Sequence, residues 1–376
     1  GCDDMRLFKR TERNIPASAA NDSEQAMPMP TGFSKRPRIM RFYNTPRLIG
    51  RMSVVGEKES KGPVGKYFQK CETDDKMGEK TFERAEIRMF DTAVRGAVRD
   101  SRLSLEDIDL FVSGDLLNQM TTSSYAARDI GVPHLGVYGA CSTMTESLLV
   151  AATMVDGGYF GNVLCAASSH FATAERQFRF PLEYGCQRPP YAQWTVTGAA
   201  ATVVAKNTED TERYPKIVMG IPGIITDFGT NDLNNMGAAM APAAMDTMYT
   251  LLTQSGYDEN DFDLMVTGDL GKLGSDILRD LMRRRGIRIG QNYIDCGNMI
   301  YDVDQKCYQG GSGCACSATI FNSFIMDKLI SGEYKRVAYL ATGALMSTQS
   351  CYQGETIPCI SHCVVVESPY CGTEGK

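Results

Sequence analysis

Cys141 is the residue of this sequence best placed to do chemistry. Residues 135–143 read as an apolar strand that enters a helix through a tight turn, and Cys141 stands at that turn. At the start of a helix, unpaired N–H groups and the helix dipole stabilise a thiolate or a bound anion. A small residue packed into a crowded turn would give the same pattern. The local sequence leaves these two interpretations open.

The other cysteines show no spacing that indicates a metal site or a disulfide framework. The sequence holds 13 of them, several on apolar stretches, where a free cysteine behaves as a small hydrophobic residue. Cys314 and Cys316 come nearest to zinc-ligand spacing, but no second pair completes a site. We expect buried thiols in a reducing compartment, and neither a metal nor a cofactor.

The elements that position Cys141 occur twice. Residues 107–116 (DIDLFVSGDL) return as residues 261–270 (DFDLMVTGDL), with seven of ten positions identical. Residues 139–169 then align without gaps on residues 313–343, and each stretch reads as a turn, a helix, a glycine-containing break and a buried strand. This duplication predicts two similar α/β halves packed face to face. The second copy carries Ala315 where the first carries Cys141.

The chain divides at a polar stretch near its middle. Residues 1–36 are polar and without period and are predicted to be disordered. Residues 37–206 and 215–376 are predicted to be the two halves, joined by a hinge at residues 207–214. We expect an amphipathic helix over residues 81–100, a helix near residues 243–254 and an apolar strand at residues 363–367.

Bulk composition excludes some functions. The 376 residues carry a net charge of −6, which argues against a nucleic-acid partner. No apolar run reaches the roughly 18–20 residues that cross a bilayer, so we expect any membrane association to be peripheral.

Several strings together indicate a family. GDLLNQ and AARDIGVPHLGVYGACST resemble the strand, loop and nucleophile turn of thiolases and ketoacyl synthases, and MGAAMAPAA resembles the thiolase segment that opens the second half. With GACSTMTESL, SSHFATAERQFRFPLEYG, TVTG, GGSGCACSA and ETIP, they are more similar still to the stage V sporulation protein AD family of spore-forming bacteria. The resemblance extends over residues 45–368.

The resemblance implies a thiolase-like five-layered αβαβα fold made of two duplicated halves, and a role in spores. It also implies binding of dipicolinic acid (pyridine-2,6-dicarboxylate), free or as its calcium chelate, during uptake into the developing spore. The implied partners are membrane proteins of the same sporulation operon. The implied location is the forespore or spore, peripheral on the inner membrane, and a homodimer through the sheet edge is compatible with this family.

Alignment with the related enzymes predicts that the usual catalytic helpers are absent. Gly268 falls at the histidine of the ketoacyl synthase loop, and Ser312 falls at the histidine or asparagine of the later loop. A serine donates a hydrogen bond but is no base near neutral pH. Cys359 lies where thiolases carry their second cysteine, and His362 could supply a base or simply bond a neighbouring loop. We therefore expect a binding protein rather than an enzyme.

A dipicolinate site needs N–H donors, one or two cations and a flat apolar wall. Cys141 and Ser142 would supply the donors, and His170 and Arg176 are predicted to contact the carboxylates. The alternatives are a buried, satisfied histidine at His170 and a structural ion pair between Arg176 and Glu175 or Asp227. The remaining residues predicted to line the site are Asn118, Gln119, Ser312 and His362.

Two other functions remain open from the sequence. The chain could be an active acyltransferase or thiolase that uses Cys141. It could also be a purely structural member of a membrane complex in the spore, with a pocket that is a relic of an enzyme.

Overall fold

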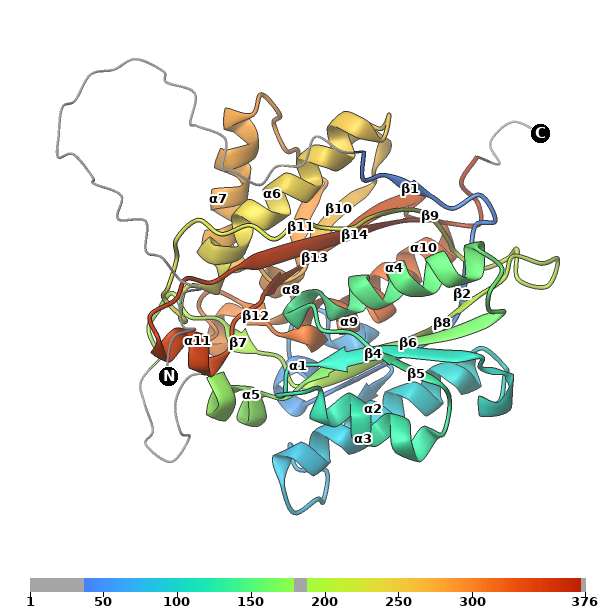
Figure 1. Ribbon diagram of the computed structural model, residues 1–376, viewed down its shortest axis with the longest axis horizontal. Coiled ribbons are helices and arrows are strands. Elements are labelled where there is room, and N and C mark those ends of the chain that lie inside the picture. Colours follow the sequence, from blue (N-terminus) through green and yellow to red (C-terminus); the bar gives the residue numbers. More distant parts are fainter. Residues whose placement is uncertain (1–36, 179–187, 373–376) are drawn as a thin grey trace, which may run out of the picture. The chain divides into compact units, whose positions relative to one another are not determined.

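A computed structural model describes residues 37–178 and 188–372 (Figure 1). The extension predicted to be disordered, residues 1–36, lies outside these described residues. Within residues 37–178 and 188–372, no helix combines the length and the apolar character needed to cross a membrane.

Two five-stranded sheets with one strand order form the framework, and the pairing of Arg47 with Lys216 joins them at one edge into a continuous sheet. In the first, the order β5-β4-β6-β8-β2 comprises β2 (Arg47–Val55), β4 (Leu110–Asp115), β5 (His134–Gly136), β6 (Asn162–Ser169) and β8 (Gly198–Ala205). In the second, the order β11-β10-β13-β14-β9 comprises β9 (Lys216–Ile221), β10 (Leu264–Thr267), β11 (Tyr293–Asp295), β13 (Arg336–Ala344) and β14 (Cys359–Glu367). In each, the strand next to the end, β8 or β14, is antiparallel to both neighbours. The duplication seen in the sequence is therefore a duplication of topology.

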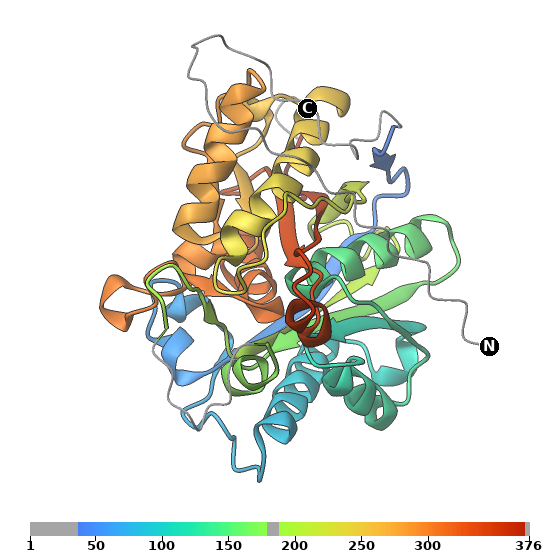
Figure 2. The same ribbon diagram turned by 60° about the vertical axis from the view of Figure 1, so that its left-hand side comes forward.

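Helices alternate with the sheets to give five layers, which confirms the expected fold class (Figures 1 and 2). The pair α2 (Phe82–Asp100) and α3 (Thr121–Ile130) covers the outer face of the first sheet, and α6 (Met236–Gln254) and α7 (Gly271–Arg284) cover that of the second. Between the sheets lie α4 (Thr143–Asp156) and α9 (Cys314–Ile320).

Burial on both faces explains the apolar strands and the apolar central helix. In β4, Leu110 and Val112 join the central core, whereas Phe111 joins the core beneath α2, because successive side chains of a strand point to opposite faces. α4 touches both sheets and is buried on most of its sides, whereas α2 buries one side.

Shorter elements join these layers. They are β1 (Met40–Arg41), α1 (Glu57–Ser60), β3 (Lys70–Cys71), α5 (Phe171–Phe178), β7 (Trp194–Thr195), α8 (Cys296–Ile300), β12 (Gly311–Ser312), α10 (Met326–Ser331) and α11 (Thr348–Tyr352). β7 and β12 pair in parallel, which brings Thr195 of the first half beside Ser312 of the second.

Most element predictions hold, with two boundaries moved. The helix predicted at residues 81–100 is α2, whose N-cap Thr81 accepts a hydrogen bond from the backbone N–H of Arg84 at 3.3 Å. The helix expected from residue 243 begins at Met236, so MGAAMAPAA is helical throughout. The last strand begins at Cys359 rather than at residue 363. Residues 207–214 form the turns between β8 and β9.

Candidate functional site

The turn before α4 holds Cys141 under local backbone strain. After β5 the chain passes through Gly139 and Ala140, and Ala140 has φ of +49°, a conformation that residues with a Cβ seldom adopt. The turn also passes very close to β13, since a Cβ at Gly343 would lie 1.9 Å from the carbonyl oxygen of Gly139. Residues 140–142 then form a single 3₁₀ turn that leads into α4. This packing presents the half-buried Cys141 to a cavity.

A buried carboxyl group, that of Asp269, is the nearest functional partner of Cys141. The thiol donates a hydrogen bond to this carboxyl group. Burial raises the pKa of Cys141 well above its usual value, and the charges of Asp269 and Cys314 raise it further. The thiol is therefore protonated at neutral pH. The thiolate that the helix start suggested is not formed, because burial and a neighbouring acid outweigh the helix dipole.

Asp269 is held in place from three sides. Its Oδ2 accepts the backbone N–H of Gly313 at 3.0 Å, and its Oδ1 accepts the hydroxyl of Thr342 at 2.9 Å. Burial raises the pKa of Asp269 to about 7, and the carboxyl of Asp295 adds to this shift, whereas the bonds from Cys141, Gly313 and Thr342 oppose it. Asp295 itself accepts the backbone N–H groups of residues 270 and 271 and so fixes the loop that carries Asp269.

Sequence reasoning overlooked Asp269 by one position. It considered Gly268, where a histidine would stand in related enzymes, but a Cβ at Gly268 would lie 3.1 Å from the backbone of β13. The polar group that reaches the cysteine comes from the next residue. A signal was present, because this aspartate belongs to the repeated GDL motif and its copy is Asp115.

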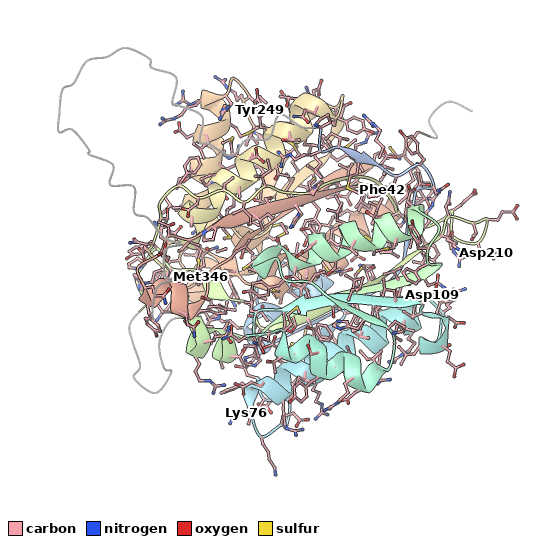
Figure 3. All side chains as sticks on the ribbon, viewed as in Figure 1. Phe42, Lys76, Asp109, Asp210, Tyr249 and Met346 are labelled. Carbon is pink, nitrogen blue, oxygen red and sulfur yellow. The ribbon has the colours of Figure 1, made fainter. Side chains whose placement is uncertain are left out.

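A cavity lies beside Cys141, and the empty space in it and at its open mouth together amounts to about 490 Å³. Its wall is mostly apolar. The lining residues are Leu116, Tyr138, Ala140, Cys141, Ala174, Glu175, Phe178, Thr195, Met236, Met240, Ser312, Ala344 and Met346. Met346 is labelled in Figure 3, close to α11. Residues of both halves contribute, so the cavity exists only when the halves are packed together.

Of the residues predicted to bind ligand, Cys141 and Ser312 line this cavity. Ser142 lies behind the turn, fully buried, and its hydroxyl donates to the carbonyl oxygen of Gly139 at 2.6 Å. Its side chain is therefore committed to the turn.

His170 matches the structural alternative. It is 1% exposed, its Nε2 donates to the carbonyl oxygen of Asp75 at 2.8 Å, and its Nδ1 accepts the N–H of Ala172 at 3.1 Å. Burial lowers its pKa. The imidazole thus accepts a hydrogen bond from the first turn of α5 and anchors the loop at Asp75. It does not line the cavity.

His362 is likewise away from the thiol. It lies on β14, and its Nδ1 accepts the N–H of Gly223 at 3.1 Å. Burial lowers the pKa of His362 to about 4, so the ring is neutral near pH 7. The third histidine of the sequence, His134, bonds the hydroxyl of Ser113 at 2.9 Å. Within the described residues, therefore, no histidine lines the cavity.

Arg176, Asn118 and Gln119 lie on the outer surface. Arg176 and Asn118 border a separate hollow between α2, α3 and α5, and Gln119 is exposed in the loop before α3. Arg176 pairs with Glu83 of α2, not with either of the two acids considered from the sequence. The placement of these three residues does not bring them to Cys141.

An arginine that sequence reasoning missed, Arg188, stands next to the cavity instead. Its Nη1 lies 2.7 Å from Oε1 of Glu175, which lines the wall. The guanidinium also lies over the rings of Phe171 and Trp194, which stack at 4.0 Å. No spacing in the sequence marks this residue, because its partners come from α5 and β7.

The described residues show no metal centre. No group of three or more possible ligands converges within the described part of the chain. The thiols of Cys314 and Cys316 donate instead to the carbonyl oxygens of Ala140 and Gly268.

Solved structures identify the fold. A variant of OleA from Xanthomonas campestris matches with a TM-score of 0.56 and 17% identity over 87% of this chain and 99% of its own. Another OleA variant, solved with cerulenin, matches with a TM-score of 0.55 and 17% identity over 87% of this chain and 98% of its own. The fold is thus that of the thiolase-like proteins.

Sequence comparison identifies the family. The sequence model of stage V sporulation protein AD matches residues 36–367. Stage V sporulation protein AD of Bacillus subtilis (strain 168) is 44% identical over 315 residues, which cover 84% of this chain and 92% of the relative. The chain belongs to the stage V sporulation protein AD family.

Proposed function

We propose that this protein is a non-catalytic receptor that binds dipicolinic acid in the cavity at Cys141. Membership of a sporulation family supports the biological setting, and the cavity supports a small ligand with one apolar face. Methionine, leucine and phenylalanine side chains provide the apolar part of the wall. The thiol of Cys141 and the hydroxyls of Tyr138, Thr195 and Ser312 are the polar groups that a ligand would meet beside Glu175.

The observation that carries the non-catalytic part is the pairing of Cys141 with Asp269. A nucleophilic cysteine needs a base that removes its proton and donors that stabilise the developing oxyanion. Here the partner is an acid whose charge opposes thiolate formation, and each of the three histidines is bonded elsewhere. A cavity that keeps its thiol protonated is suited to binding.

Calorimetric titration tests the binding. Purified protein is titrated with pyridine-2,6-dicarboxylate and, as control, with pyridine-2-carboxylate. We expect saturable heat with the dicarboxylate and weaker binding of the monocarboxylate. No heat from either, or equal affinity for both, would defeat the proposal. A parallel titration with the calcium chelate shows which form is preferred.

The cellular part of the proposal is uptake of the ligand into the developing spore, together with membrane proteins of the same operon. Peripheral attachment to the inner spore membrane through such partners agrees with the lack of a spanning helix in residues 37–178 and 188–372. Fractionation of spores that lack those membrane proteins tests it. The protein should then leave the membrane fraction.

Acyl transfer is the competing function, and the retained Cys141 in a thiolase-like fold is what favours it. Incubation with radiolabelled acyl-CoA of several chain lengths, followed by mass spectrometry of the Cys141 peptide, separates the two. An acyl group on Cys141 would replace the receptor interpretation with a catalytic one.

A further inference from the structure

Arg188 is a positively charged side chain that pairs with the cavity wall on the side of α5. The cavity itself is lined by Glu175, 7% exposed, and Arg188 lies immediately behind this carboxylate. Thr195, which also lines the cavity, donates from its hydroxyl to the same Oε1 at 3.4 Å. Arg188 is therefore one side chain away from the ligand space.

The guanidinium has donor capacity that its described neighbours do not use. Both terminal nitrogens are buried, and within the described residues neither has a hydrogen-bond partner of acceptable geometry, although Nη1 is ion-paired with Glu175. A buried N–H without an acceptor is costly, and an arginine offers five donors in a planar fork. An incoming carboxylate would satisfy these donors.

Aromatic rings hold the guanidinium in position. Its central carbon lies 5.2 Å from the ring centre of Trp194 and 5.7 Å from that of Phe171. A second cation, Lys58, lies 4.4 Å above the Trp194 ring and donates to the carbonyl oxygen of Gln305 at 2.9 Å. Rings on one side and a carboxylate on another restrict the rotamers of Arg188, so little further ordering is needed to bind an anion.

Arg176 provides an internal contrast. It also pairs with a glutamate, but its side chain is 42% exposed, whereas that of Arg188 is 22% exposed. Arg176 borders the outer hollow. Water and salt screen such a pair, and they screen a more buried one less.

From this geometry we infer that Arg188 is the specificity-determining residue for a ligand with a second carboxylate. Nη1 of Arg188 stays ion-paired with Glu175, and a ligand carboxylate accepts a hydrogen bond from Nη2. The inference rests on the proposed receptor function and assigns within it the group that distinguishes a dicarboxylate from a monocarboxylate. Glu175 sets an upper limit on affinity, because its negative charge faces the same space.

The test compares two ligands on four proteins. Dissociation constants for pyridine-2,6-dicarboxylate and pyridine-2-carboxylate are measured by calorimetry on the wild type, Arg188→Gln, Arg188→Lys and the matched control Arg176→Gln. We expect Arg188→Gln to weaken dicarboxylate binding about 10- to 100-fold, leaving the monocarboxylate unchanged. Arg188→Lys should lie between, because it keeps the charge and loses the fork. Arg176→Gln should match the wild type.

Glu175→Gln should have the opposite effect on the dissociation constant. It removes a negative charge from the cavity wall, so the dicarboxylate should bind more tightly. An Arg188→Gln protein that still prefers the dicarboxylate overturns the inference and leaves the receptor proposal standing. Equal weakening of both ligands also overturns it, since that pattern indicates a collapsed wall. A wild type that binds neither ligand overturns both proposals.

Discussion

The two halves repeat one turn with opposite outcomes. In the first half the turn residue is Cys141, half-buried and facing the cavity. In the second it is Ala315, fully buried, whose N–H donates to Oγ of Ser169 at 3.1 Å. Ser169 belongs to the first half, and a Cβ at Gly198 of the same half would lie 3.4 Å from that of Ala315. One helix start is open to a ligand, and the other is sealed by the opposite half.

The repeated aspartate differs in the same way. Asp115 lies in a fully buried acidic pair with Glu86 and accepts bonds from the backbone and hydroxyl of Ser123 at 2.7 Å. Its copy, Asp269, faces the thiol of Cys141. The same backbone position thus supports the core of one half and adjusts the chemistry of the other. What surrounds a repeated position decides its role.

Enlarging the two turn residues should show the largest difference between the two halves. Ala315→Leu is expected to lower the free energy of unfolding by about 2–3 kcal/mol, because the sealed turn has no space. Cys141→Leu should cost less than about 1 kcal/mol, since its side chain can extend into the cavity, but should abolish dipicolinate binding. Urea denaturation and calorimetry measure the two effects. Equal destabilisation by both substitutions contradicts the comparison.

The acidic pair of the first half predicts a pH dependence of stability. Burial, aided by Asp115, raises the pKa of Glu86 from 4.5 to about 8. The folded state then binds this proton more tightly than the unfolded state, so the stabilisation is complete below the ordinary pKa and is lost as the pH rises toward 8. Glu86→Gln should reduce the loss of unfolding free energy between about pH 5 and pH 8 by about 3 kcal/mol. Denaturation curves that fall equally in both proteins would falsify this.

Removing the serine hydroxyl that closes the second turn should have a smaller effect on the free energy of unfolding. Ser169→Ala leaves the N–H of Ala315 and the carbonyl oxygen of Val196 without their hydroxyl partner, at a cost of about 1 kcal/mol. Thermal unfolding measures the change. Ligand affinity serves as the control and should not move, because Ser169 does not line the cavity.

The smallest expected effect is on the reactivity of the Cys141 thiol in the open turn. Cys141 should react with iodoacetamide near pH 8 more slowly than the exposed Cys71, because burial and Asp269 raise its pKa. Asp269→Asn removes the opposing charge and should speed alkylation at Cys141 with Cys71 unchanged. Peptide mass spectrometry follows both sites. Rapid alkylation of Cys141 in the wild type would show that the thiol is already activated.

The elements and the fold could be predicted because their causes are local or repeated. Strands buried on both faces leave continuous apolar runs, and the amphipathic α2 leaves a helical period. The two copies of the aspartate motif show that one topology occurs twice. Cys141 could be identified because the turn that carries it differs from its copy at that residue.

Which residues form the site was harder to predict, because this depends on where side chains from distant segments of the chain point. His170 and Arg176 follow the strand that ends near Cys141, yet one turns to the loop at Asp75 and the other to α2. Asp269 and Arg188 lie in segments remote from the cysteine, and only packing brings them near it.

The amino-acid sequence by itself determined the duplicated α/β architecture, the family and the one cysteine-bearing turn, because periodicity and repetition are properties of the chain. Only the tertiary structure decided that the thiol meets an acid, that the twin turn is closed and that Arg188 pairs with the cavity wall. These depend on the contact between the halves, where burial shifts protonation and the facing side chain, rather than the local motif, sets the chemistry.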